Sequence, residues 1–497
     1  MLLWKPKSPA VLCFHPFLLS LVIIISTVKS KLLFFPPPWS DILIFSIATL
    51  ATAFLLFRFF LSLFHDGKKA GILSSVMLLF IFFYFPLFHT LFGVRFIYDF
   101  IYIFLFQKFH WVLLSLGIVL LALVYIAIKK TRKNLNGLTG FLNLFVLVLL
   151  LFEFSKIFFD DEFEVSVQKE FNEQAVHLNK KPGRNIYYLV MDSYTSSKSL
   201  KKYWNYENNE LQDFLIAKGF FIAASSKCNY NSTPFSILSA LNMSYLNIES
   251  YHEGQKVHIS KVFRMIQNNA VVRALSENGY DILNLSLFDL MNEPAYYADP
   301  YYHKPSLFDK TIFHLPADKM GISSDRILFK TLASANIEII SKVTSSNKNA
   351  KPVFCYAHPM MPHEPFFFDE LGNKMPDEYA LNSDEKEKKY FRQLKYTNTL
   401  LMKTVEGILN NSKIKPIIII QGDHGFRYLD DMDYNEQLEE SKTILNAYLF
   451  PDDTLKNSFY DSISPVNSFR IIFNTYFGTE LSLLKDRSFN IEITPEK

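Results

Sequence analysis

A chain of 497 residues in which 49% are hydrophobic and 50 are phenylalanine is too apolar for an ordinary soluble protein. Its net charge of +3 is close to neutral, which argues against nucleic acid as a partner. The apolar residues form long runs up to about residue 158 and are ordinarily spaced afterwards. We therefore expect a membrane domain over residues 1–158, a juxtamembrane linker over 159–183 and a globular domain over 184–497.

Five apolar stretches in the first domain have roughly the twenty residues that crossing a bilayer requires. They are approximately Val11–Val28, Ile42–Phe64, Ile72–Phe92, Trp111–Ile128 and Leu138–Phe158. A sixth stretch, Phe96–Phe106, is short and carries Asp99, so it is interfacial, re-entrant or a sixth span. We treat the first stretch as a retained anchor, with a cleaved leader as the alternative.

Basic residues between the spans predict the orientation of the chain. With five spans, eight basic residues flank one side of the membrane and four flank the other. The eight are Lys5, Lys7, Lys68, Lys69, Lys129, Lys130, Arg132 and Lys133, and the four are Lys29, Lys31, Arg95 and Lys108. The richer side is cytoplasmic by the positive-inside rule. The chain is then a multi-pass protein of the cytoplasmic membrane, with its globular domain on the periplasmic or extracellular side.

The globular domain alternates strand-like and helix-like segments. Strands are expected at Asn185–Met191, Phe220–Ala224, Tyr280–Leu285, Pro352–Ala357, Ile417–Ile420 and Asn446–Phe450. Helices are expected at Leu211–Lys218, from Pro234 onward, and at Val262–Asn278, 384–411 and Pro465–Tyr476. This alternation predicts an α/β domain with a largely parallel sheet. The aromatic stretch 286–320 is expected to be a substrate-facing insertion.

Polar side chains follow three of the predicted strands. Asp423 and His424, between Gly422 and Gly425, come after four isoleucines that suit a strand buried on both faces. We expect the glycines to let the backbone turn, so that both side chains reach one point. Asp192 and His358 follow two other strands. Because ligand sites lie beyond the carboxyl ends of parallel strands, the pattern predicts a metal site there.

Thr233 precedes Pro234, a residue that suits the first position of a helix. We expect Thr233 to be the N-cap of that helix, at the positive end of the helix dipole. A threonine there is either a simple cap or an activated nucleophile, since its hydroxyl needs a base or a metal to react at neutral pH.

The order of these segments over roughly residues 185–480 resembles the alkaline-phosphatase/sulfatase superfamily. The matching pieces are Asp192 after the first strand, Thr233-Pro-Phe-Ser236 at a helix start, the His358 to Pro365 segment, and Asp423-His424-Gly425 after a late strand. Several membrane spans before such a domain look like the phosphoethanolamine transferases and lipoteichoic acid synthases of the cell envelope.

The resemblance implies that Asp192, Thr233, Asp423 and His424 bind a divalent metal ion, either Zn or Mn. It also implies that Thr233 is the catalytic nucleophile. His358 or His363 would contact the phosphoryl group of the substrate or a second ion. A phospholipid would donate phosphoethanolamine or phosphoglycerol, and a surface glycan or lipid would accept it.

Two alternatives remain beside the transferase. One is a sulfatase-like hydrolase, acting as a phosphodiesterase or a sulfatase. Sulfate ester hydrolysis ranks lower, because the chain lacks the Cys/Ser-x-Pro-x-Arg motif of formylglycine sulfatases at Thr233. The other is a catalytically inactive, membrane-anchored binding protein. Cys13, Cys228 and Cys355 make no disulfide framework, and we expect the last two to be buried free thiols, with one bridge as the alternative.

Overall fold

The computed structural model describes most of both predicted domains. The described residues are 11–32, 39–92, 109–159, 178–179, 183–246, 259–297, 307, 311, 324–345, 351–375, 383–427, 433–451 and 458–491. The stretch Phe96–Phe106, most of the linker 159–183 and much of the aromatic stretch 286–320 lie outside them. Contacts divide the chain into a membrane unit and a sheet unit. The first comprises Met1–Asp161, Tyr302–Ile327 and Pro495–Lys497, and the second Glu162–Tyr301 and Leu328–Thr494.

Five apolar helices make up most of the described part of the membrane unit. They are α1 (His15–Leu32), α2 (Trp39–Phe64), α3 (Gly67–Phe92), α5 (Phe109–Lys130) and α6 (Asn136–Phe159). Among the described residues, α2, α3, α5 and α6 are long and apolar enough to cross a membrane, and α1 is a shorter apolar helix. Leu19 and Ile23 of α1 share one core with Phe45 of α2 and Val146 of α6. The first helix is therefore packed as part of this unit.

The sheet unit contains six strands in the order β2-β6-β5-β1-β4-β3. They are β1 (Ile186–Met191), β2 (Phe221–Ile222), β3 (Asp281–Leu285), β4 (Val353–Ala357), β5 (Ile417–Gly422) and β6 (Asn446–Leu449). Strands β3, β4, β1 and β5 are parallel, whereas β6 runs antiparallel to both of its neighbours. The predicted α/β domain with a largely parallel sheet is confirmed.

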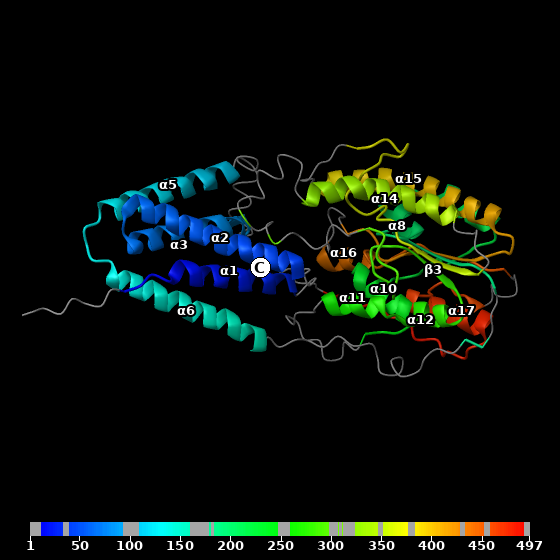
Figure 1. Ribbon diagram of the computed structural model, residues 1–497. Helices are drawn as coiled ribbons and strands as arrows, with labels where there is room; N and C mark the ends of the chain where they lie inside the picture. The colour runs from blue at the N-terminus through cyan, green and yellow to red at the C-terminus, as the bar shows by residue number, and fades with distance from the viewer. Residues whose placement is uncertain are drawn as a thin grey trace, which may run out of the picture. The chain divides into compact units, whose positions relative to one another are not determined.

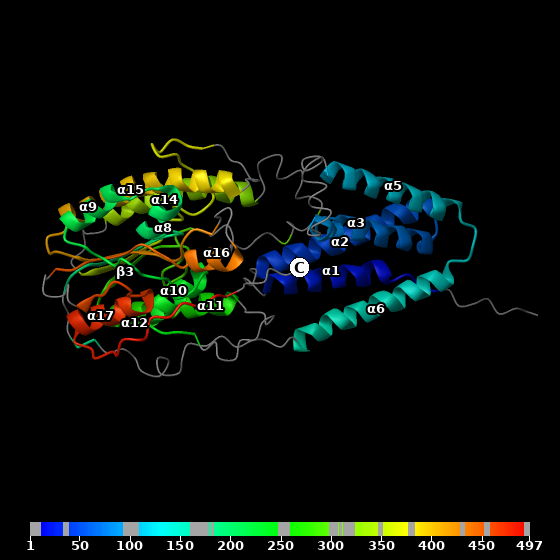
Figure 2. The ribbon, with the colours of Figure 1, turned by 180° about the vertical axis from the view of Figure 1, so that it is seen from behind.

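Helices cover both faces of this sheet (Figures 1 and 2). One layer holds α8 (Ser197–Trp204), α9 (Asn209–Ala217), α14 (Ser324–Ser345) and α15 (Ser383–Asn411), and the other holds α10 (Thr233–Asn242), α11 (Ile259–Gln267), α12 (Ala270–Glu277) and α17 (Pro465–Phe477). All of β5 is buried, as its isoleucines predicted. Leu394 of α15 packs with Ile418 and Ile420 on one face. Phe469 of α17 packs against Tyr188 of β1 on the other.

Three details differ from the sequence predictions. The predicted helix Val262–Asn278 is two helices, because Asn269 starts α12 by accepting a hydrogen bond from the Val272 N–H. Strand β2 is shorter than predicted, and α8, α14 and α16 (Tyr434–Glu440) were not predicted.

The expected free thiols are confirmed, since Cys228 and Cys355 are buried and unbridged. Burial raises the pKa of Cys228 to about 12, so this thiol stays protonated at neutral pH.

Candidate active site

Three neighbouring parallel strands bring their following residues to one place. Asp192 follows β1, His358 follows β4, and Asp423 and His424 follow β5, and β1 lies between the other two strands. Their carboxyl ends are therefore adjacent, and the side chains just beyond them meet. Each of the four residues is at most 2% exposed. Such burial of carboxylates and imidazoles is costly unless a charged or hydrogen-bonding partner compensates for it.

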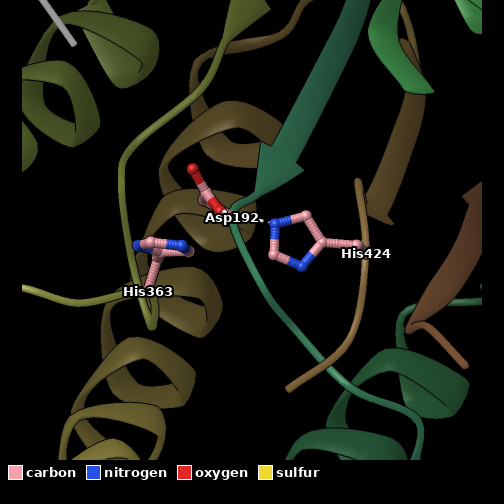
Figure 3. Close-up of side chains that lie close together, drawn as sticks. All are labelled: Asp192, His363 and His424. Atoms are coloured by element: carbon pink, nitrogen blue, oxygen red, sulfur yellow. Dashed lines mark ion pairs between the residues drawn. The ribbon is translucent and has the colours of Figure 1, made fainter. Parts of the chain in front are cut away.

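The ligand-type atoms of these residues lie too far apart for hydrogen bonds and close enough to share a cation. His424 Nε2 is 3.6 Å from an Asp192 oxygen and 3.6 Å from Asp423 Oδ2, and His358 Nε2 is 3.7 Å from the other Asp192 oxygen. Two ligands about 2.1 Å from one tetrahedral ion are separated by roughly 3.4 Å. His363 extends the group, because its ligand atom lies within 4.8 Å of those of Asp192 and His424 (Figure 3).

The hydrogen bonds of the three imidazole rings direct their Nε2 atoms toward this centre. Nδ1 of His424 lies 2.8 Å from the Gly425 carbonyl oxygen, and Nδ1 of His363 contacts that of Glu364. A carbonyl oxygen only accepts, so both Nδ1 atoms carry the proton and both Nε2 atoms present a lone pair. Nδ1 of His358 lies 2.8 Å from the Tyr356 hydroxyl. Metal-binding histidines are held in this way by the second ring nitrogen.

A divalent cation fits the atoms that remain. Within the described part of the chain, His358 Nε2, Asp423 Oδ2 and His424 Nε2 are buried and have no hydrogen-bond partner. Native proteins rarely leave such atoms unsatisfied. Two overlapping groups have metal-ligand spacing, namely Asp192, His363 and His424, and Asp192, His358 and Asp423. Carboxylate and imidazole ligands together suit Zn or Mn.

Protonation favours cation binding at this site. Burial lowers the pKa of His358 to about 4 and, together with the Arg427 charge, that of His424 to about 3. Burial also lowers the pKa of His363. Burial alone would raise the pKa of Asp423, but the nearby histidines, the Thr233 hydroxyl and a hydrogen bond from the Ser193 N–H lower it to about 2. At pH 7 the site therefore presents an ionised Asp423 and three neutral imidazoles.

Thr233 stands beside Asp423, at the start of α10. Its side chain is 7% exposed, and its hydroxyl helps to lower the pKa of the Asp423 carboxyl group. Ser236, one turn later, donates to the Asp423 carbonyl oxygen at 2.7 Å, which joins α10 to the segment that follows β5. The predicted N-cap was wrong by one position. Ser232 has the extended backbone of an N-cap, and Thr233 is the first helical residue, so its hydroxyl is not used in capping.

The two glycines around Asp423 and His424 act differently from the prediction. Neither has a positive φ. A Cβ on Gly422 would lie 2.5 Å from the Tyr194 carbonyl oxygen, and one on Gly425 would lie 2.5 Å from that of Thr443. These positions therefore need glycine because neighbouring backbone approaches closely, rather than for an unusual backbone angle.

The loop between His358 and His363 is held by its main chain. The His363 N–H donates to the Asp192 carbonyl oxygen, which joins the loop to the end of β1. Gln393 of α15 donates to the carbonyl oxygens of Pro362 and His363 and accepts from the Phe367 and Phe368 N–H groups. His358 is fully buried, whereas His363 is only half-buried. Of the two histidines predicted to contact substrate, His363 is therefore the more accessible.

Three residues around the site were missed by the sequence analysis. Ser193 has a left-handed φ of 62°, which lets its N–H donate to Asp423 Oδ1 at 2.9 Å. Tyr356 holds the His358 ring, and Arg427 follows His424 by three positions. Only Tyr356 could have been predicted from the sequence, because it lies two positions before His358 and residues two apart in a strand share a face.

The sulfatase family model matches residues 185–451, which is just over half of the chain. The chain therefore belongs to the sulfatase family, and it is an enzyme of this superfamily with membrane-capable helices. No curated protein gives a significant sequence match.

Solved structures that resemble this chain at low sequence identity include the following three. The integral membrane lipooligosaccharide phosphoethanolamine transferase A from Neisseria meningitidis is 14% identical (TM-score 0.40; 92% of this chain, 83% of that chain). The zinc complex of the C-terminal periplasmic domain of EcEptC from Escherichia coli is 10% identical (TM-score 0.37; 63% and 85%). A chain from a study of glycosaminoglycan metabolism by Bacteroides thetaiotaomicron is 15% identical (TM-score 0.38; 60% and 72%).

Proposed function

We propose that this protein is a membrane-anchored, metal-dependent transferase that moves a phosphoryl head group from a phospholipid to a surface glycan or lipid. The head group is phosphoethanolamine or phosphoglycerol, and it is carried covalently by Thr233 between the two half-reactions. The observation that carries the proposal is the position of Thr233. Its side chain is buried at the start of α10, and Ser236 of the same helix donates to the Asp423 carbonyl oxygen at the Asp/His cluster. This position of Thr233 adds a helix dipole that favours an anionic group.

Asp192, Asp423 and His424 would hold the divalent ion, with Thr233 beside them and His358 and His363 completing the two ligand groups. When bound, the ion supplies Lewis acidity that favours ionisation of the hydroxyl and offsets phosphate charge. The ligands already suit this role, because their imidazoles are neutral and Asp423 is ionised at pH 7. Zn and Mn are both consistent with the ligand types.

The reaction comprises two displacements at phosphorus. In the first, the Thr233 oxygen forms a bond to phosphorus, and the bond from phosphorus to the diacylglycerol oxygen breaks. The proton lost by Thr233 is balanced by the proton gained by the departing diacylglycerol. In the second, an acceptor hydroxyl oxygen forms a bond to phosphorus and loses its proton, while the bond from phosphorus to the Thr233 oxygen breaks and that oxygen regains a proton. His363, half-buried at the cluster, contacts the phosphoryl group in both steps.

The location of the protein follows from the same proposal. A phospholipid donor requires a site that reaches a membrane, and α2, α3, α5 and α6 are each able to cross one. We place these helices in the cytoplasmic membrane. The excess of Lys and Arg on one side supports a sheet unit on the periplasmic or extracellular side, where a surface glycan or lipid is available.

Labelled phospholipid tests the covalent step. Full-length protein in detergent is incubated with phospholipid carrying labelled head-group phosphate, and the label is mapped by mass spectrometry. We expect label on Thr233, none in Thr233→Ala, and partial labelling in Thr233→Ser, which keeps a hydroxyl. Ser232→Ala is the matched control, because the Ser232 side chain makes no capping hydrogen bond and its loss should leave labelling intact. Normal turnover in Thr233→Ala would refute the mechanism.

Product analysis separates the transferase from the hydrolase. Both enzymes form the same phosphothreonine, and they differ in whether water or an acceptor hydroxyl removes it. We expect head-group phosphate to leave Thr233 much faster when a glycan or lipid acceptor is present. Equal rates of release with and without acceptor, with free head-group phosphate as the product, would favour a phosphodiesterase.

A further inference from the structure

Arg427 lies between the two segments that carry the nucleophile and the metal-binding pair. It follows His424 by three residues, and its guanidinium donates to the carbonyl oxygen of Asn231, two residues before Thr233. Asn231 is itself fixed, because its side chain accepts from the Ile491 N–H at 2.8 Å. The charge of Arg427 is thus positioned at the edge of the cluster rather than on a free surface side chain.

The charge of Arg427 acts on two histidines of the cluster. Burial lowers the pKa values of His424 and His363, and the positive guanidinium lowers them further. Within the described part of the chain, no carboxylate lies within ion-pair distance of it. The guanidinium has five N–H donors, and its contact with Asn231 uses one nitrogen. A half-buried guanidinium of this kind is suited to bind an anion.

We propose that Arg427 binds the non-bridging oxygens of the transferred phosphoryl group while that group is attacked by, or attached to, Thr233. This role rests on the proposed function and adds a catalytic residue to it. Two oxygens of a phosphate match the fork of a guanidinium, so both charge and geometry favour the contact. The N-terminus of α10, where Thr233 stands, favours the same anion from a second direction. Negative charge on these oxygens is stabilised as the phosphorus–oxygen bond breaks.

Arg427→Gln and Arg427→Lys test this role. Binding of inorganic phosphate to the full-length, metal-loaded protein is measured by calorimetry, and turnover is measured with phospholipid in mixed micelles. We expect Arg427→Gln to weaken phosphate binding about tenfold or more and to reduce kcat/KM by roughly 10²–10³-fold. Arg427→Lys should fall between Arg427→Gln and the unchanged protein, because it keeps the charge and loses the fork.

Arg184→Gln is the matched control. Arg184 also donates to a main-chain carbonyl oxygen, that of Lys415, but it precedes β1 and so stands at the opposite end of the strand from Asp192. Its replacement should leave phosphate binding, metal content and turnover unchanged. All variants should keep their metal, because Arg427 is not a ligand.

Two outcomes would overturn the inference. One is phosphate binding by Arg427→Gln within twofold of the unchanged protein. The other is a pair of results: Arg427→Lys binds phosphate as tightly as the unchanged protein, and Arg427→Gln fails to fold. Arg427 would then have only a structural role, namely holding the segment that contains Asn231. Failure of Thr233 to become labelled while Arg427→Gln still loses phosphate affinity would refute the proposed function and leave the anion site standing.

Discussion

In α5 of the membrane unit, Leu116 and Leu120 are 62% and 61% exposed, whereas in the sheet unit Asp423 and His424 are at most 2% exposed. Soluble proteins usually show the reverse distribution, with leucine inside and aspartate outside. Both regions therefore hold side chains in surroundings that water alone does not favour. A side chain in surroundings that water does not favour therefore indicates which partner would stabilise it. For the exposed leucines that partner is lipid, and for the buried carboxylate and imidazole it is a cation.

The largest effect is expected from removing a metal ligand. Asp423→Asn and His424→Ala should each lose bound metal and reduce turnover by about 10³-fold or more, because the lost interaction acts in the transition state. A chelator should have the same effect on the unchanged protein, and added Zn or Mn should restore activity. Metal content is measured by elemental analysis and turnover with labelled phospholipid. Normal metal content in both variants would contradict the ligand assignment.

A stability measurement sharpens this result. Although burial alone would raise the pKa of Asp423, the nearby histidines and a hydrogen bond from the Ser193 N–H lower it to about 2, so the folded protein favours the ionised carboxylate. Without metal, Asp423→Asn should therefore unfold at a lower temperature than the unchanged protein at pH 7. Added metal should stabilise only the unchanged protein. An unchanged or higher unfolding temperature of metal-free Asp423→Asn would contradict a folded state that favours the ionised carboxylate.

An intermediate effect is expected from truncating apolar side chains in the two units. Ile419 in β5 is fully buried, so Ile419→Ala should lower the free energy of unfolding by about 2–5 kcal/mol. Leu120 faces outward on α5, so Leu120→Ala should change it by less than about 0.5 kcal/mol. Denaturation of the full chain in detergent measures both. A large loss in Leu120→Ala would mean that this face of α5 packs against protein rather than lipid.

The smallest effect is expected behind the metal ligands. Tyr356→Phe removes the hydroxyl that holds Nδ1 of His358, and it should weaken metal binding about 10–100-fold. Tyr188→Phe is the matched control, because Tyr188 is equally buried and stacks on Tyr356, but its hydroxyl donates to Gln421. Metal affinity is measured by competition with a chelating dye. Equal losses in the two variants would indicate a general packing effect.

The sequence predicted the parts of the site that local patterns encode. Asp192, His358 and the Asp423-His424 pair each follow an apolar run, and a parallel sheet brings strand ends together whatever the intervening chain does. The strands could be placed for the same reason, since β-branched and aromatic runs such as Ile417–Ile420 have few other uses.

The parts that it did not predict depend on contacts between distant segments. Arg427 is identified by its hydrogen bond to Asn231, which lies almost two hundred residues earlier in the chain. Ser193 is identified by its left-handed backbone conformation, which the neighbouring residues do not predict. Thr233 was placed as a cap because Pro234 fits more than one early helical position, so sequence alone does not choose between Ser232 and Thr233 as the start. The sequences of α14 and α16 lack a strong helical periodicity of apolar residues, so these helices were not predicted.

The contacts of Gly422 and Gly425 bear on how substitutions in this region should be interpreted. In a saturation library over residues 422–425, selection for folding alone would retain glycine at both ends, since any Cβ would overlap the Tyr194 or Thr443 carbonyl oxygen. Asp423 and His424 would be retained only under selection for activity. Tolerance at the four positions therefore separates into a steric requirement and a chemical one, and an intolerant glycine here is no measure of catalytic importance.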